Sequence, residues 1–158
     1  MDRSIIDKLE AGGETLRRSV EGLSKEDLLA HPIPGTWSIQ EIVLHLVDTD
    51  QILCERIKRM IAEPNPTLLA FDESRWTRNL HYDLQSVEDA LQIDILVRRQ
   101  IARVLRASDD EVLSRFGVHT ERGPTKLSEL VPMLDWHLEH HMKFLLKKRA
   151  LLGKPLKE

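Results

Sequence analysis

Three histidines stand close together near the end of the chain, in the stretch DWHLEHHMKF at positions 135–144. His137 and His141 are four residues apart, and a helix places side chains at that spacing one above the other. Two imidazoles placed in this way form half of a binding site for a transition metal. His140 points about 60 to 100° further round the helix, because each residue advances by about 100°. The spacing therefore indicates an inward pair, His137 and His141, beside one outward histidine.

A third candidate ligand, His45, lies far upstream in the stretch WSIQEIVLHL. It falls beside Ile42, Leu46 and Thr49, on the rim of an apolar helix face, where a polar ring without a buried partner costs free energy. Three histidines on two facing helices can satisfy one another through one metal ion, with a coordination position left open as in catalytic zinc sites. The alternative is that the rings form ordinary hydrogen bonds in the core or at the surface.

Two carboxylates close to His45 have competing interpretations. Asp48, one turn later, could orient a ligand imidazole by a hydrogen bond, or it could be a solvated helix carboxylate. Glu41, one turn earlier, forms the pattern of a capping box with Ser38, which explains it without a metal. Asp48 is therefore kept as a weak catalytic candidate, and Glu41 is assigned to the helix cap.

Asp94 and Arg98 are charged residues on an otherwise apolar helix face. They are one turn apart, so the simplest interpretation is an internal salt bridge, since charges rarely enter a core unpaired. The functional alternative has the acid facing a metal-bound water and the arginine binding an anionic group of a substrate. Both residues are weak catalytic candidates on periodicity alone.

The remaining histidines and the single cysteine fit the site less well. Cys54 lies about 180° around the helix from His45, so it faces away from the proposed site. His31, His81 and His119 lie in connections, and of these His81 could reach the mouth of the site.

Hydrophobic periodicity predicts four long helices that would position these side chains. Ser38 and Glu41 begin the second helix, and Gly153 with Pro155 ends the fourth. Gly12 weakens the first helix in its middle, and Pro132 is interpreted as a first-turn residue or a kink of the fourth. The predicted helices cover about residues 2–20, 38–63, 86–107 and 125–152.

The connections between these helices are longer than a simple bundle needs. Residues 64–85 show no clear periodicity, and compact domains seldom carry such a loop without a function, so a lid or wall of the site is expected. Residues 108–124 turn the chain, and a short helical turn is expected at 24–29. We predict an all-α fold, a four-helix bundle with long connections, and one domain spanning 1–158.

The composition of the chain limits which classes of function are expected. The chain has 158 residues, 41% of them hydrophobic and 31% charged, with a formal net charge of −3. Nucleic-acid binding usually needs an excess of positive charge, so nucleic acid is not an expected partner. A single cysteine cannot form an internal disulfide. The N-terminal stretch lacks the apolar segment that is typical of a signal peptide. No apolar run is as long as a membrane-spanning helix. We expect a cytoplasmic protein.

Two motifs resemble a known family. GTWSIQEIVLHLVDTD resembles the second-helix signature of the DinB/YfiT-like superfamily, and DWHLEHHMKFL is similar to the final-helix motif of that family. The stretches FDESRWTRNLHYDL and RGPTKLSELV also resemble the family pattern, so the match spans nearly the whole chain.

This resemblance implies a four-helix bundle, often a homodimer, with a divalent metal ion held by three histidines. Carried over residue by residue, the metal ligands are His45, His137 and His141. Zinc and nickel are the usual metals of the family, and its activities centre on thiol transfer, thiol-dependent isomerisation and suspected hydrolysis.

Two function hypotheses follow. The first is a metal-dependent enzyme acting on a small-molecule substrate, in which the ion activates water or a low-molecular-weight thiol for hydrolysis or S-transfer. The second is a non-catalytic bundle that binds metal or a small molecule in a stress response. A pocket that opens onto the metal position favours the enzyme, because a fourth protein ligand closes a structural site.

Overall fold

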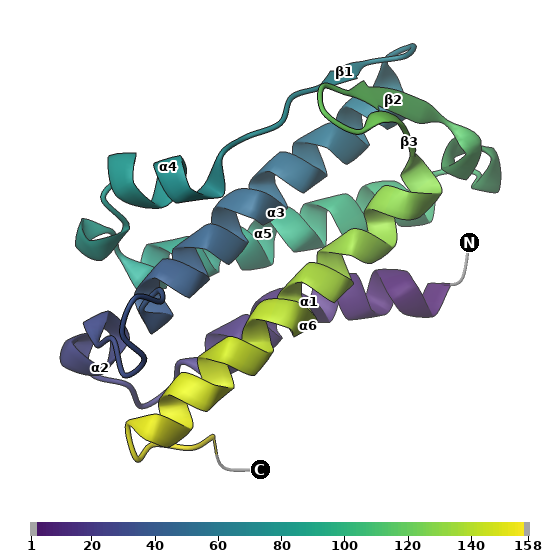
Figure 1. Ribbon diagram of the computed structural model, residues 1–158. Coiled ribbons are helices and arrows are strands. Elements are labelled where there is room, and N and C mark those ends of the chain that lie inside the picture. Colours follow the sequence, from purple (N-terminus) through teal and green to yellow (C-terminus); the bar gives the residue numbers. More distant parts are fainter. Residues whose placement is uncertain (1–2, 157–158) are drawn as a thin grey trace.

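A computed structural model describes residues 3–156 and shows a four-helix bundle (Figure 1). The predicted all-α bundle is confirmed, and each predicted long helix is present with bounds that differ by a few residues. The four bundle helices are α1 (Arg3–Ser19), α3 (Ile39–Ala62), α5 (Val87–Ala107) and α6 (Leu127–Leu151).

The bundle helices do not pack in the order of the chain. The most extensive helix contacts are those of α1 with α5 and α6, and those of α3 with the same two helices. Helices that follow one another, α1 and α3 or α5 and α6, therefore lie across the diagonals of the bundle. Such crossings need long connections, and the first of these contains the predicted short helix, α2 (Lys25–Leu29).

The start of α3 follows directly from its sequence. The Ser38 hydroxyl accepts a hydrogen bond from the Glu41 amide at 3.1 Å, and the Glu41 carboxylate accepts one from the Ser38 amide at 2.6 Å. This reciprocal capping box satisfies two amides that have no partner inside the helix. The cap confirms the predicted helix start, and it places His45 two turns into α3.

Helix α1 continues through Gly12 because the glycine makes room for a partner helix. A Cβ atom at Gly12 would lie 2.3 Å from Nη1 of Arg98 on α5. A side chain here would displace the arginine, so the gain in packing outweighs the low helix propensity of glycine. The predicted first helix is therefore continuous despite this glycine.

The two long connections, residues 64–86 and 108–126, contain short elements that were not predicted from the sequence. They contain a short helix, α4 (Glu73–Asn79), two 3-10 turns, η1 (Tyr82–Leu84) and η2 (Asp110–Ser114), and three short strands, β1 (Thr67–Leu68), β2 (Phe116–His119) and β3 (Gly123–Lys126). β1 pairs in parallel with β2, and β2 pairs antiparallel with β3. Strands of two to four residues are too short to show alternation, and α4 spans only two turns.

Pro132 lies in the second turn of α6, because this helix begins at Leu127. Its interpretation as a first-turn residue was wrong. The Lys126 amide donates to Glu129 at 3.2 Å, which satisfies one free donor at the helix start.

The core has two apolar clusters with a polar layer between them. The first cluster lies toward the small sheet and includes Leu53, Ile57, Ile101 and Leu134; the second lies toward the other end and includes Leu16, Leu46, Leu91 and Leu138. Asp50, Asp94 and Arg98 are fully buried between the clusters. No helix within residues 3–156 is both long and apolar enough to cross a membrane.

Candidate metal centre

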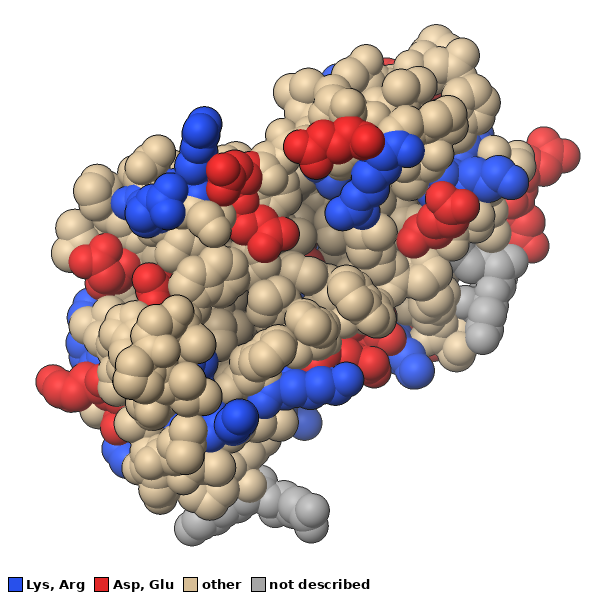
Figure 2. Space-filling view, viewed as in Figure 1, with Lys and Arg blue, Asp and Glu red and all other residues tan. Residues whose placement is uncertain are grey.

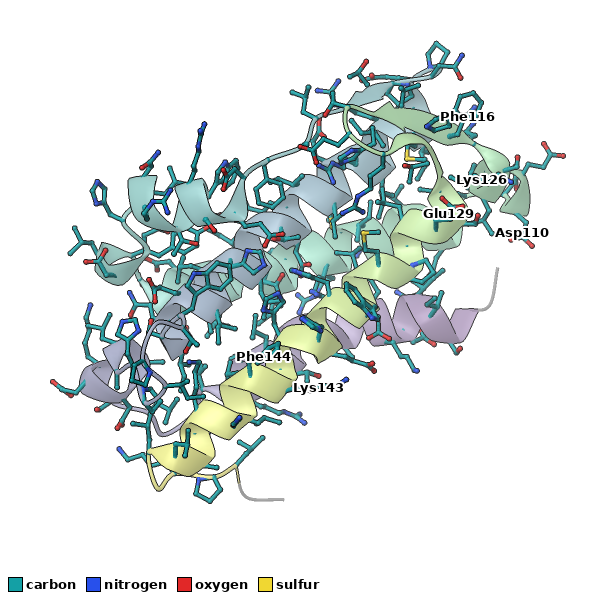
Figure 3. The ribbon with its side chains drawn as sticks, in the orientation of Figure 1. Asp110, Phe116, Lys126, Glu129, Lys143 and Phe144 are labelled. Carbon is teal, nitrogen blue, oxygen red and sulfur yellow. The ribbon has the colours of Figure 1, made fainter. Side chains whose placement is uncertain are left out.

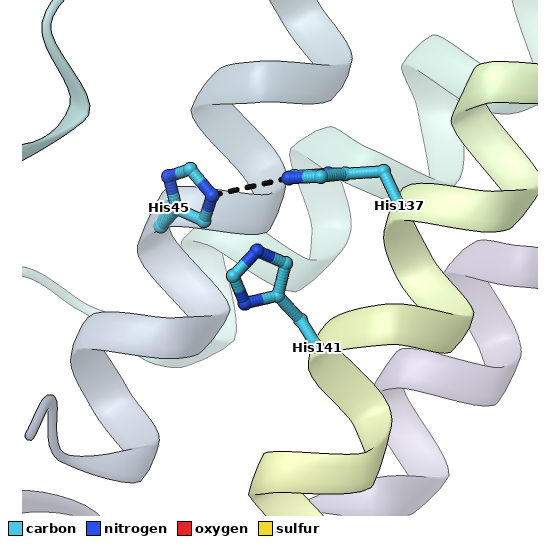
Figure 4. Close-up of side chains that lie close together, drawn as sticks. All are labelled: His45, His137 and His141. Carbon is cyan, nitrogen blue, oxygen red and sulfur yellow. Dashed lines mark hydrogen bonds between the residues drawn. The ribbon is translucent and has the colours of Figure 1, made fainter.

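The structure brings together the three histidines singled out in the sequence (Figure 4). His45 projects from α3, and His137 and His141 project from successive turns of α6. Nε2 of His45 lies 3.1 Å from Nε2 of His137, and one ring nitrogen from each of the three lies within 4.8 Å of the others. The three rings therefore converge on a single point between the two helices.

Burial keeps these rings neutral. His45 is 1% exposed and His137 is 9% exposed. Loss of hydration, with repulsion among the rings, lowers the pKa of His45 and of His137 to about 3 and the pKa of His141 to about 4. Neutral imidazoles keep a nitrogen lone pair at pH 7, and that lone pair is what a metal ion requires.

The donor set fits a divalent metal ion. Two histidine nitrogens bound to zinc at about 2.0–2.1 Å in a tetrahedron lie about 3.4 Å apart, close to the 3.1 Å between His45 and His137. Nδ1 of His45 and Nδ1 of His137 are buried and have no hydrogen-bond partner. The hydrogen bond between Nε2 of His45 and Nε2 of His137 therefore satisfies only part of this cluster, whereas three nitrogens facing one point suit a shared cation.

Trp37 forms one wall of the centre. Its ring centroid lies 4.8 Å from that of His45 and 6.2 Å from that of His141, nearly parallel to the latter. Since Nδ1 of His45 has no polar partner, packing against this indole holds the His45 ring in place. Trp37 is thus a packing residue that contacts two of the candidate ligands, His45 and His141.

Glu73 is a residue of this centre that the sequence analysis missed. Its carboxylate lies 3.9 Å from Nε2 of His45, and its side chain is 51% exposed. Burial raises the pKa of Glu73 above the ordinary value. The residue stands in the first turn of α4, a helix too short to be recognised by periodicity, so only Asp72 in the capping position signalled its place.

Asp48 does not orient a histidine. Its carboxylate accepts a hydrogen bond from the Tyr82 hydroxyl at 2.5 Å, while Nδ1 of His45 stays without a partner. Burial raises the pKa of Asp48, and the Tyr82 hydrogen bond opposes that shift. Asp48 instead ties the long connection, through η1, to the helix that carries His45.

Asp94 and Arg98 form the internal salt bridge that was the simpler of the two interpretations. Nε of Arg98 lies 3.2 Å from the Asp94 carboxylate, and Nη1 donates to the Leu9 carbonyl at 3.1 Å. Asp50 on α3 forms a second ion pair with Arg98. The sequence analysis missed Asp50, although it follows Leu46 and precedes Leu53 on the core face of α3.

The other candidates are not part of the three-histidine cluster. His140 is stacked on Trp136, with ring centroids 5.3 Å apart, on the outer side of α6. Cys54 is buried in the first apolar cluster, where burial raises its pKa to about 12. His119 accepts hydrogen bonds from two amides of the β2–β3 turn, and His81 is exposed.

A pocket opens beside the centre. It has a volume of about 320 Å3 and is lined by His141 together with Trp37, Ile42 and Phe144 from the surrounding segments. A second, larger groove of about 760 Å3 runs along α3 beneath the 67–76 segment, and it reaches Asp48 and Trp76. The long connection, which was expected to form a lid or wall of the site, borders this groove and also reaches the histidine centre through Glu73.

Named proteins from two bacteria align with most of this chain. A protein of Oceanobacillus iheyensis named "Putative metal-dependent hydrolase" is 26% identical over 137 residues, which are 87% of this chain and 79% of that protein. A Bacillus cereus protein of the same name is 27% identical over 148 residues, covering 94% of this chain and 85% of the relative.

Solved structures share the fold. YfiT from Bacillus subtilis, described as "a probable metal-dependent hydrolase with an unusual four-helix bundle topology", superposes with a TM-score of 0.88 at 21% identity, over 95% of this chain and 86% of YfiT. The mycothiol-dependent maleylpyruvate isomerase superposes with a TM-score of 0.69 at 13% identity, over 90% of this chain and 59% of that enzyme. The family model of the DinB superfamily matches residues 8–145. This chain belongs to the DinB superfamily.

Proposed function

We propose that this protein is a divalent-metal-dependent hydrolase, with His45, His137 and His141 as the metal ligands. The observation that carries the proposal is the convergence of three neutral histidine nitrogens within 4.8 Å of one another beside an open pocket. The names of the O. iheyensis and B. cereus relatives support a divalent metal ion and hydrolysis.

A metal ion bound by three histidines supplies Lewis acidity and lowers the pKa of a water or a thiol in its open position. The residues of this chain do the rest. The three imidazoles hold the ion, and the Trp37 indole keeps two of these rings in position. The Glu73 carboxylate, 3.9 Å from Nε2 of His45, would serve as a hydrogen-bond acceptor beside the ion.

Metal content tests the proposal directly. Untagged protein is analysed by mass spectrometry for zinc and nickel, in wild type, His45→Ala and His140→Ala. We expect near-stoichiometric metal in wild type and in His140→Ala, because His140 lies outside the cluster, and loss of metal in His45→Ala. Wild-type protein that cannot be loaded with zinc or nickel would refute the proposal and leave the non-catalytic small-molecule bundle.

The same position suits a low-molecular-weight thiol, so transfer of a thiol is the second reaction to assay. Metal-loaded protein is compared on activated esters, for hydrolysis, and on an electrophile with added thiol, for S-transfer. Turnover with esters alone supports the hydrolase, whereas strict dependence on the thiol favours a thiol transferase. We also propose a homodimer, in line with the family resemblance, and light scattering after size-exclusion chromatography tests it.

A further inference from the structure

A buried lysine without a counter-charge lines the pocket beside His141. Lys148 of α6 is 2% exposed, and its ammonium donates to the Thr36 hydroxyl at 2.6 Å. An ammonium has three donors, and Lys148 has no ion pair within the described residues. A buried cation normally has an anionic partner, because the lost hydration must be replaced.

The acid that acts on Lys148 already has other partners. Glu41 is the carboxylate that favours the charged form of Lys148, yet it caps α3 by accepting from the Ser38 amide and lies 3.9 Å from the His31 imidazole. Burial remains the larger influence and lowers the pKa of Lys148.

The next residue, Arg149, shows how this bundle satisfies a cation with a purely structural role. Arg149 is also buried, and it donates to three backbone carbonyls, those of Ser19, Glu21 and Lys154, at 2.8 to 3.0 Å. Lys148 has one hydroxyl as its partner and faces a cavity. The two adjacent cations therefore differ in their partners: Arg149 donates to three carbonyls, whereas Lys148 donates to one hydroxyl beside the cavity.

The pocket between Lys148 and His141 suits a small apolar body. Its walls are Ile33, Trp37, Ile42 and Phe144, and its volume of about 320 Å3 falls in the range of small-molecule sites. Phe144 of α6 (Figure 3) lines the pocket and is 47% exposed. His141 and Lys148 are seven residues apart on α6, a rise of about 10 Å.

We propose that this pocket binds the substrate of the metal centre, and that the substrate is a small apolar molecule carrying one carboxylate, which pairs with Lys148. The Thr36 hydroxyl accepts from Lys148 and donates its own proton to the Ile33 carbonyl at 2.8 Å, so the remaining protons of the ammonium are the donors for the carboxylate. The single positive charge of Lys148 matches a monoanion. The inference rests on the proposed function, since the reacting bond would then lie at the histidines, about 10 Å from the carboxylate.

The test uses metal-free protein, so that the carboxylate cannot bind to the metal. Isothermal titration calorimetry measures the binding of 3-phenylpropionate and of its uncharged amide to wild type, Lys148→Met and Lys147→Met. Lys147 is the exposed neighbour and serves as the matched control. We expect the acid to bind wild type and Lys147→Met about ten-fold more tightly than the amide, and Lys148→Met to lose this preference.

A second variant locates the binding. Phe144→Ala removes a half-exposed wall, so the fold is preserved, and it should weaken the acid and the amide to a similar extent. Equal binding of acid and amide to wild type, no binding of the acid at millimolar concentration, or affinities unchanged by Phe144→Ala would overturn the inference. Because these outcomes need no buried substitution, they decide it even if Lys148→Met fails to fold.

Metal loading separates this inference from the proposed function. Metal-binding protein without a preference for the acid would defeat the pocket inference alone. A preference for the acid in protein that cannot be loaded with metal would defeat the metal-dependent function and leave the anion-binding pocket.

Discussion

The bundle holds two buried polar clusters, little more than one helical turn apart on α3, and they are built in opposite ways. Around Arg98, charges of both signs meet, and the guanidinium pairs with Asp50 and Asp94. Around His45, three neutral rings of one kind face one another, and Nδ1 of His45 and Nδ1 of His137 have no hydrogen-bond partner. The first cluster contains a cation together with its anions, although Oδ1 of Asp50 has no hydrogen-bond partner, whereas the second offers nitrogen lone pairs and contains no cation.

The two polar clusters also differ in how accessible they are from the surface. The Arg98 cluster lies between α1, α3 and α5, sealed above and below by the two apolar clusters. The histidine cluster lies between α3 and α6, on the face drawn in Figure 2, where charged residues of both signs surround a hollowed, largely uncharged surface. Burial of polar groups thus marks a site only when the groups cannot satisfy one another and the cluster can be reached.

Removal of Arg98 should have the largest effect. Arg98→Met leaves Asp50 and Asp94 buried without a cation, and breaking a buried ion pair in this way costs about 3–5 kcal/mol. Urea denaturation followed by circular dichroism measures the free energy of unfolding. Arg106→Met is the control on the same helix, because Arg106 pairs with Asp7 and Glu10 at the surface and should change stability little. Equal losses in both variants would contradict the distinction drawn between buried and exposed pairs.

A metal ion bound by the three histidines should raise the free energy of unfolding. A metal at one hundred times its dissociation constant raises the free energy of unfolding by about 2.7 kcal/mol, because it binds only the folded chain. Thermal denaturation with and without zinc or nickel measures this, and His137→Ala should abolish the gain while His140→Ala keeps it. A gain of equal size in His137→Ala would place the metal elsewhere.

Acid should weaken the metal-free protein through the same histidines. Burial lowers the pKa of His45 and of His137 from 6.5 to about 3, so the unfolded chain binds protons more readily than the folded one. Their contribution is fully present above pH 6.5 and is lost as the pH falls from there toward 3. Between pH 6.5 and 5.5 the loss is about 1 kcal/mol per histidine. A double variant, His45→Phe with His137→Phe, should flatten this part of the stability profile measured by urea denaturation.

The smallest effect is expected from a residue that touches neither cluster. Ser38→Ala removes the capping hydroxyl of α3 and should cost about 1 kcal/mol in unfolding free energy. Metal affinity, measured by titration calorimetry, should stay unchanged because His45 lies beyond the first turn. A large loss of affinity would mean that the cap also positions the imidazole.

Much of the fold could be predicted because its signals are local. Ser38 with Glu41 marks the start of α3, and Ser86 marks the start of α5, because capping depends on residues three apart. The short elements α4 and β1 could not be predicted in this way. They span too few residues for a period, and β1 exists only because β2 pairs with it.

The sequence also determined which histidines could share a metal ion, since the spacing of His137 and His141 and the place of His45 on an apolar rim are properties of single helices. Only the tertiary structure decided what surrounds them. Glu73 reaches His45 through a helix distant in the chain, Asp50 joins Arg98 across two helices, and Lys148 meets Thr36 at the end of a pocket. Local periodicity sets the direction of each side chain, but packing between distant segments decides which polar groups are satisfied and which are left to bind a ligand.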